Sequence, residues 1–127
     1  MNALVLDAGA LVAVDRDDRR MIARLRAAQR HGIELRTNAM VVSQVWRDPP
    51  GRQARLGQLL RAVDVHAVDQ HTGREAGVLL ARTGTDDPID ATIVLLTETG
   101  DRVLTSDPED ITALAAAAQR RVLVVAC

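Results

Sequence analysis

Short apolar runs and longer segments of helical periodicity alternate along the whole chain. The runs are rich in Val, Leu and Ile, as buried strands of a parallel sheet are. The longer segments repeat apolar residues at helical spacing, which predicts amphipathic helices. The predicted strands lie at 3–6, 33–37, 64–68, 102–107 and 120–127, and the predicted helices lie within 17–31, 39–46, 52–63, 70–83, 86–100 and 108–119. This alternation predicts an α/β fold in which α-helices flank both faces of a central parallel β-sheet.

One acid interrupts the first apolar run. The stretch "ALVLDAGALVAV" at 3–14 is almost wholly apolar except for Asp7. A carboxylate buried without a partner costs more free energy than one side chain can return. Asp7 therefore either ends the strand at a turn or is kept for chemistry, and the apolar pattern leaves both open.

The composition supports one domain with an aliphatic core. The 127 residues are 47% hydrophobic but only 1% aromatic, and Trp46 is the single aromatic residue. A β-sandwich usually carries more aromatic side chains in its strands, so helices packed on a sheet are favoured. At this length the chain, 1–127, is predicted to form a single domain.

Charge and cysteine content narrow the class of protein. Every basic residue is Arg, and the formal net charge is -1. No global basic field favours nucleic acid, although a local basic patch can still exist. The single Cys127 excludes an intrachain disulfide and a Cys-rich zinc site, and it fits a reducing cytoplasm. No apolar segment reaches the roughly 20 residues that span a bilayer, and no signal-peptide pattern is present, so a cytoplasmic protein without a membrane partner is expected.

Three acids are predicted to meet at one edge of the sheet. Asp7 ends the first strand, and Asp107 ends the strand "RVLTSD". Asp90 lies in the first turn of the helix between them in sequence. Ligands of parallel α/β sheets bind outside the carboxyl ends of the strands. A carboxylate cluster is therefore expected at this edge.

Two segments, 87–90 and 107–110, share the pattern Asp-Pro-x-Asp. Asp at the N-cap followed by Pro and an acid is also a favourable helix start, so capping is the alternative to catalysis. The expected proximity to Asp7 favours a cation, because carboxylates brought close together repel one another. Carboxylates without neighbouring Cys or His suit Mg²⁺ or Mn²⁺ rather than zinc. Such a site supports phosphoryl transfer.

Several other classes of acidic or phosphate-binding site are excluded by the residues. Neither GxxxxGK[ST] nor GxGxxG occurs, so a P-loop or a dinucleotide fingerprint is unsupported. A phosphoacceptor receiver domain uses a Lys, and this chain has none. A haloacid-dehalogenase-like phosphatase has a second Asp two residues after the first, where this chain has Gly9.

Four segments resemble a known family. "LVLDAGALVAV", "VVSQVWRD", "DPIDATIVLLTETG" and "VLTSDPEDI" are similar, in order and at the usual spacing, to PIN-domain ribonucleases, specifically the VapC toxins of bacterial toxin–antitoxin pairs. The resemblance covers nearly the whole chain. It implies a metal-dependent endoribonuclease that uses Mg²⁺ or Mn²⁺ and cuts structured RNA such as tRNA or an rRNA loop. It also implies a cognate VapB-like antitoxin, whose C-terminal segment blocks the site, and a homodimer.

The resemblance assigns roles to individual residues. It implies that Asp7, Asp90 and Asp107 are catalytic and bind the metal ion. Asp110 becomes a further metal ligand or an orienting acid. Asp87 is a secondary candidate whose expected role is capping.

Two hydroxyl residues precede Asp107. By the same resemblance, Thr105 and Ser106 hold a ligand or a water molecule by hydrogen bonds. The alternative is that they only help to cap the next helix.

One position departs from the family pattern. The family has a Glu before Val-Trp, whereas this chain has Gln44. An amide oxygen can bind a hard cation but carries no negative charge, so weaker metal binding is expected, above all of a second ion. Asp48 lies four residues further on and could compensate if the helix continues, although Pro49 opposes this. The alternative function is therefore a catalytically impaired PIN-like protein that binds RNA or its antitoxin.

Arginine side chains are the expected contacts to RNA phosphates. They surround the first predicted amphipathic helix and the segment after Trp46, and for each of them a solvated helix face is the alternative. Trp46 could stack on a base or pack in the core. The candidate RNA-binding residues are Arg16, Arg19, Arg20, Arg24, Arg47, Arg52 and Arg55.

Overall fold

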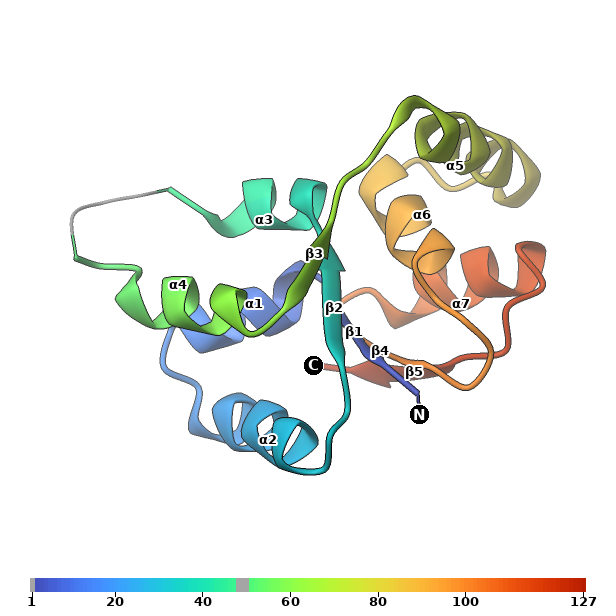
Figure 1. Cartoon of the computed structure of the whole chain (residues 1–127). Coiled ribbons are helices and arrows are strands. Elements are labelled where there is room, and N and C mark those ends of the chain that lie inside the picture. The colour runs from blue at the N-terminus through green and yellow to red at the C-terminus, as the bar shows by residue number, and fades with distance from the viewer. Residues whose placement is uncertain (1, 48–50) are drawn as a thin grey trace.

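The computed structural model describes residues 2–47 and 51–127, and these form a parallel β-sheet between two groups of helices (Figure 1). The strands in the described ranges are β1 Leu4–Leu6, β2 Leu35–Asn38, β3 Asp64–His66, β4 Arg102–Thr105 and β5 Leu123–Ala126. The helices in the same ranges are α1 Ala8–Asp15, α2 Arg19–Arg30, α3 Ala39–Val45, α4 Ala54–Arg61, α5 Gln70–Thr83, α6 Pro88–Leu95 and α7 Pro108–Ala117.

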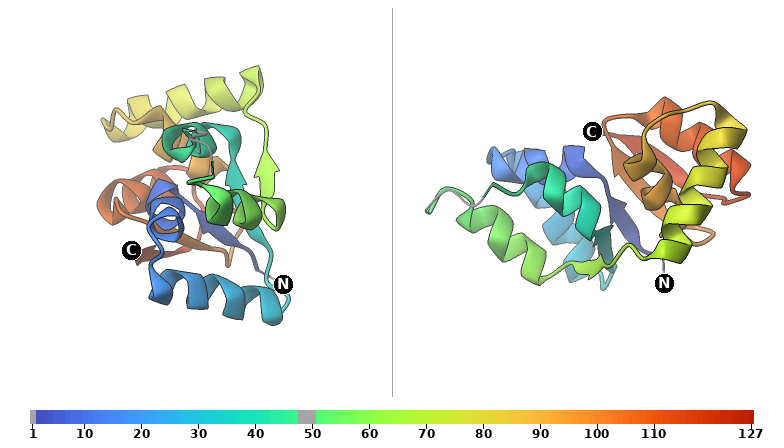
Figure 2. Two further views of the ribbon diagram at one scale, coloured as in Figure 1. Left: turned by 90° about the vertical axis from the view of Figure 1, so that its left-hand side faces the viewer. Right: turned by 90° about the horizontal axis from the view of Figure 1, so that it is seen from above.

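The strand order explains where the chain can build a site. The sheet runs β3-β2-β1-β4-β5, and all of its pairs are parallel. The helices α1 to α4 pack on one face, and α5 to α7 pack on the other, as Figures 1 and 2 show from three sides. The segments that follow β1 and β4 therefore leave the sheet toward opposite faces and open a crevice between their carboxyl ends. The predicted α/β fold with a parallel sheet flanked on both faces is confirmed.

Helix α1 is the main element that the sequence pattern did not predict. Its sequence, "AGALVAVD", is apolar all round, so it has no polar face to produce a helical period. The structure buries Ala10, Leu11 and Val14 of α1, which packs against α2, α3, α4 and β4. A helix that is enclosed on so many sides needs no polar stripe, so its sequence shows no helical period.

The core is aliphatic, as the composition predicts. Val5 and Leu6 of β1 and Val103 of β4 are completely buried between the two helical layers. Burial of such side chains contributes about 1.5 to 3 kcal/mol each relative to exposure. Within the described residues, no helix is long and apolar enough to cross a membrane.

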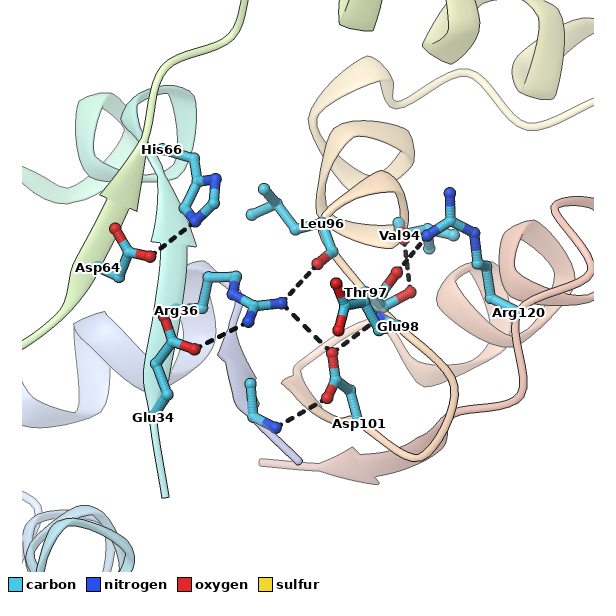
Figure 3. Close-up of polar contacts among 11 residues, drawn as sticks. Glu34, Arg36, Asp64, His66, Val94, Leu96, Thr97, Glu98, Asp101 and Arg120 are labelled. Atoms are coloured by element: carbon cyan, nitrogen blue, oxygen red, sulfur yellow. Dashed lines mark hydrogen bonds and ion pairs between the residues drawn. The ribbon is translucent and has the colours of Figure 1, made fainter. Parts of the chain in front are cut away.

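An ion pair ties β2 to the start of β4 at the amino edge of the sheet (Figure 3). Arg36 of β2 donates to the carbonyl oxygen of Leu96 at 2.9 Å and lies 3.4 Å from Asp101 Oδ2. Asp101 also accepts hydrogen bonds from the backbone N–H groups of Ala3 and Glu98, each at 2.8 Å. One buried carboxylate therefore joins β1, β2 and the connection that follows α6.

The Asp101→Ala variant should lose about 3 kcal/mol of unfolding free energy at pH 7, because it removes the acceptor of two backbone N–H groups and one of the two carboxylates that pair with the Arg36 guanidinium. Urea denaturation followed by circular dichroism measures this loss. The matched control is Glu75→Ala, which removes an exposed carboxylate paired with His71 on α5 and should leave the urea midpoint close to wild type. Equal midpoints for the two variants would contradict the role given to Asp101.

Candidate metal centre

Three acids meet at the carboxyl edge of the sheet because of the elements that carry them. Asp7 follows β1 and is the N-cap residue of α1. Asp107 follows β4 and precedes α7, which begins at Pro108. Asp90 lies in the first turn of α6 and is buried. Since β1 and β4 are neighbours, the acids from both strand ends lie beside the crevice between them.

Asp7 is held by hydrogen bonds to both carboxylate oxygens. Its Oδ1 accepts from the backbone N–H of Ala8 at 2.8 Å, and its Oδ2 accepts from the hydroxyl of Thr105 at 2.7 Å. The side chain is buried, and burial raises its pKa, while the bonds from Thr105 and Ala8 act in the opposite direction. Asp7 thus ends a strand and caps a helix, but it also stands among other acids.

Asp90 is a buried acid with a carboxylate oxygen that no donor of the described residues reaches. The residue is 4% exposed, and its buried Oδ2 has no hydrogen-bond partner among the described residues. Burial raises the pKa of Asp90 to about 8, and the nearby Asp107, Asp7 and Asp87 carboxylates add to the shift. A buried carboxylate oxygen without a donor is costly unless a proton or a cation occupies it.

Asp110 joins this group from the first turn of α7. Asp90, Asp107 and Asp110 each offer one carboxylate oxygen, and these oxygens all lie within 4.8 Å of one another. Oxygen donors at such spacing fit Mg²⁺ or Mn²⁺, and a cation would offset the repulsion that raises the pKa of Asp90. Together with the unpartnered Oδ2 of Asp90, the donor set fits a hard divalent cation. Asp7 lies outside this trio and approaches the acids from the β1 side.

Of the supporting residues, Asp87 has a structural role as a helix cap, and Ser106 lies close to α1. Asp87 caps α6, because its Oδ1 accepts from the backbone N–H groups of Ile89 at 2.9 Å and Asp90 at 3.3 Å. Ser106 is exposed beside the first turn of α1, and a Cβ built on Gly9 would lie 3.1 Å from its side chain. Gly9 therefore permits the close approach of the β4–α7 connection to α1.

Gln44 lies on α3, the helix that follows β2, and its side chain is exposed. It belongs to a different helix from the acids of the trio, which stand on α6 and at the start of α7. Asp48, which could compensate for the missing charge if the helix continued, lies outside the described residues.

A buried pair that sequence reasoning missed joins the end of β2 to the middle of α6. Asn38 ends β2, caps α3 by accepting from Val41 N–H at 3.0 Å, and donates its amide to the hydroxyl of Thr92 at 2.9 Å. Thr92 lies two residues after Asp90 on α6. An Asn between a strand and a helix signals a cap. The contact with Thr92 has no sequence signal, because 54 residues separate the pair.

The candidate RNA-binding arginines occupy exposed positions, and several already have partners in the protein. Arg19 and Arg55 lie 3.8 and 3.5 Å from Asp17, and Arg47 donates to carbonyl oxygens at the end of α3. Trp46 is half-buried and packs beside Gly57 of α4. Contacts of these side chains with RNA remain a prediction. The candidate RNA-binding arginines, all of them exposed, are Arg16, Arg19, Arg20, Arg24, Arg47, Arg52 and Arg55.

Comparison with known proteins identifies the fold. No protein-family model and no curated protein sequence matches the chain. A chain in the crystal structure of VapBC2 from Rickettsia felis bound to a DNA fragment from their promoter matches with a TM-score of 0.69 and 10% sequence identity. The match covers 98% of this chain and 98% of that chain. The protein therefore has a PIN-like fold, and the resemblance to VapC toxins is confirmed at the level of the fold.

The raised pKa of Asp90 predicts how stability depends on pH in the metal-free protein. Between its ordinary pKa of 3.8 and about 8, the folded state keeps a proton that the unfolded state has released. The free energy of unfolding should therefore fall as the pH rises through this window. In Asp90→Asn this contribution is absent, so its Tm in EDTA should exceed that of wild type at pH 8 and approach it at pH 5.

Thermal unfolding at both pH values measures this difference, with Asp64→Asn as a control that changes an exposed acid. Parallel pH profiles for wild type and Asp90→Asn would refute the assigned protonation of Asp90.

Proposed function

We propose that this protein is a metal-dependent endoribonuclease of the VapC type. The observation that carries the proposal is the buried Oδ2 of Asp90, which lacks a protein partner in an acid group that suits a divalent cation. The PIN-like fold supports the same reading, since PIN domains are typically metal-dependent nucleases. Because RNA is the proposed substrate, the protein would act in the cytoplasm.

The acids of the site form two groups in the proposed mechanism. Asp90, Asp107 and Asp110 would hold Mg²⁺ or Mn²⁺, and Asp7 would contribute from the end of β1. A bound divalent cation supplies Lewis-acid chemistry for hydrolysis of a phosphodiester. The carboxylates set the position and orientation of the scissile phosphate only indirectly, because they repel its negative charge. Exposed arginines would bind the flanking phosphates and keep the RNA on the protein.

A protein partner follows from the same proposal. The matching structure is that of VapBC2 bound to a DNA fragment. We propose that the present protein likewise binds a cognate VapB-like antitoxin. The C-terminal segment of this antitoxin would block the acidic site. A homodimer is proposed on the same family resemblance.

Gln44 supports a second candidate function. The α3 position that carries a Glu in the family is a neutral amide here, so the site has one negative charge fewer. If that charge is needed, the protein binds RNA or its antitoxin without efficient cleavage. The two candidates differ in one measurable property, which is metal-dependent hydrolysis of RNA.

Purified protein free of antitoxin should cleave structured RNA such as tRNA in Mn²⁺ or Mg²⁺ and not in EDTA. Asp7→Asn and Asp90→Asn should each lower the rate about a hundredfold or more, because loss of a metal ligand removes several kcal/mol of transition-state stabilisation. Gel analysis of the RNA with sequencing of the new ends measures cleavage and locates it. Asp64→Asn is the control for an acid outside the site. Wild-type cleavage no faster than that of Asp7→Asn would reject the enzyme in favour of the binding protein.

Restoring the missing charge tests the effect of Gln44. Gln44→Glu should lower the Mn²⁺ concentration at half-maximal cleavage by roughly threefold to tenfold, since a unit charge near a cation in water contributes about 1 kcal/mol. Gln58→Glu adds the same charge at an exposed position on α4 and should leave the Mn²⁺ requirement unchanged. An equal response of the two variants would mean that position 44 does not act on the metal site.

A further inference from the structure

A groove of about 640 Å³ lies between α2 and the sheet, on the side of β4 and β5. Leu4, Leu104 and Val125 form its floor, and Ala27 and Ala28 of α2 form its wall. Leu104 and Val125 are partners in the register of β4 and β5, and such partners point to the same face of a sheet. Because α2 presents two small side chains here, the helix leaves apolar floor uncovered.

Two arginines without partners also line the groove, Arg24 of α2 and Arg102 at the start of β4. Neither guanidinium forms a hydrogen bond or an ion pair with another side chain of residues 2–47 and 51–127. By contrast, Arg19 and Arg55, which line the groove between α2 and α4, both lie within ion-pair distance of Asp17. The groove between α2 and β5 therefore combines apolar surface with cations that are available to an anion.

The Arg24 end of the groove lies close to the acid group. Burial raises the pKa of the Cys127 thiol, Asp7 raises it further, and Arg24 lowers it. Arg24 and Asp7 thus act on the same place, just beyond the end of β5. An anion bound at this end would be repelled by Asp7 while it is attracted by Arg24.

The Arg102 end of the groove lies at the amino edge of the sheet and has no such opposing charge. Asp101 and Glu34, the acids at this edge, both pair with Arg36. Arg102 is exposed and keeps its charge free for an added ligand. A ligand with one anionic group therefore places it at Arg102 and not at the opposite end.

We propose that this groove binds a free fatty acid of medium chain length, with its carboxylate on Arg102 and its alkyl chain between α2 and β5. Charge complementarity selects the anion, and the apolar floor selects the chain. The volume of about 640 Å³ lies in the usual range of small-molecule sites, which are mostly apolar with a few polar groups. The inference goes beyond the proposed function and does not depend on it, because it uses none of the metal-binding acids.

Isothermal titration of the wild type with two amphiphiles below their micelle concentrations tests the proposal. Decanoate should bind about tenfold more tightly than decyltrimethylammonium, which has the same chain but the opposite charge. Arg102→Gln should remove most of this preference. Arg26→Gln is the matched control, because Arg26 is an exposed arginine of α2 that lines the groove with α4 instead.

A second pair of variants tests the place of the alkyl chain. Ala27→Leu fills the groove and should weaken decanoate binding by about tenfold or more, because a packed site has no room for extra atoms. Ala23→Leu makes the same change at an exposed position of α2 that does not line the groove, and it should bind decanoate as the wild type does.

Amide NMR of the wild type gives a measurement that does not depend on the folding of a variant. Decanoate should shift the amide signals of Leu104 and Val125 most strongly. Shifts confined to other elements, or equal affinities for decanoate and decyltrimethylammonium, would overturn the proposal. Equal effects of Arg102→Gln and Arg26→Gln, or of Ala27→Leu and Ala23→Leu, would also overturn it. Shifts of Leu104 and Val125 that depend on protein concentration without ligand would assign the groove to a second copy of the chain and reject the fatty acid.

Discussion

Crowding of carboxylates at the carboxyl ends of β1 and β4 is the constraint on which the site depends. The strand order places Asp7 and Asp107 on neighbouring strands, and α6 brings Asp90 beside them. These charges repel, and burial increases the cost, as the raised pKa of Asp90 shows. A proton on Asp90 would relieve this repulsion, and a divalent cation would relieve it more completely. The repulsion among these acids is what would give the proposed metal centre its affinity for a cation.

The rest of the fold holds the acids in place against this repulsion. Helix α6 is fixed near its middle by the bond from Asn38 to Thr92, and at its end by Arg36, which donates to the Leu96 carbonyl oxygen. Both donors come from β2, so one strand restrains the middle and the end of the helix that carries Asp90. The buried Asp101 holds Arg36 in position from the opposite edge of the sheet. Stability at the amino edge and chemistry at the carboxyl edge are thus linked through β2 and α6.

Much of the fold could be predicted from the sequence, because most strands are short apolar runs and helices such as α2, α4 and α5 repeat apolar residues at helical spacing. Helix α1 could not, since a helix buried on nearly all sides has no polar face. The acids at the site were also predicted, because each follows a strand or opens a helix. The partners of those acids were not: Thr105 with Asp7 and Asn38 with Thr92 are separated by 98 and 54 residues. No local pattern encodes such pairs.

The sequence by itself determined which chemical groups are present and at which ends of their elements they stand. Asp-Pro helix starts and apolar runs are local features, and the absence of Lys is a feature of the composition. All three can therefore be identified from the sequence. The sequence also predicted that Asp87 caps a helix, as it does. Only the tertiary structure decided that Asp90, three residues further on, is buried with an oxygen that has no partner among the described residues. It likewise committed the Thr105 hydroxyl to Asp7 and Asp107. Burial and hydrogen-bond partners depend on which distant segments meet, and that is set by the strand order of the sheet.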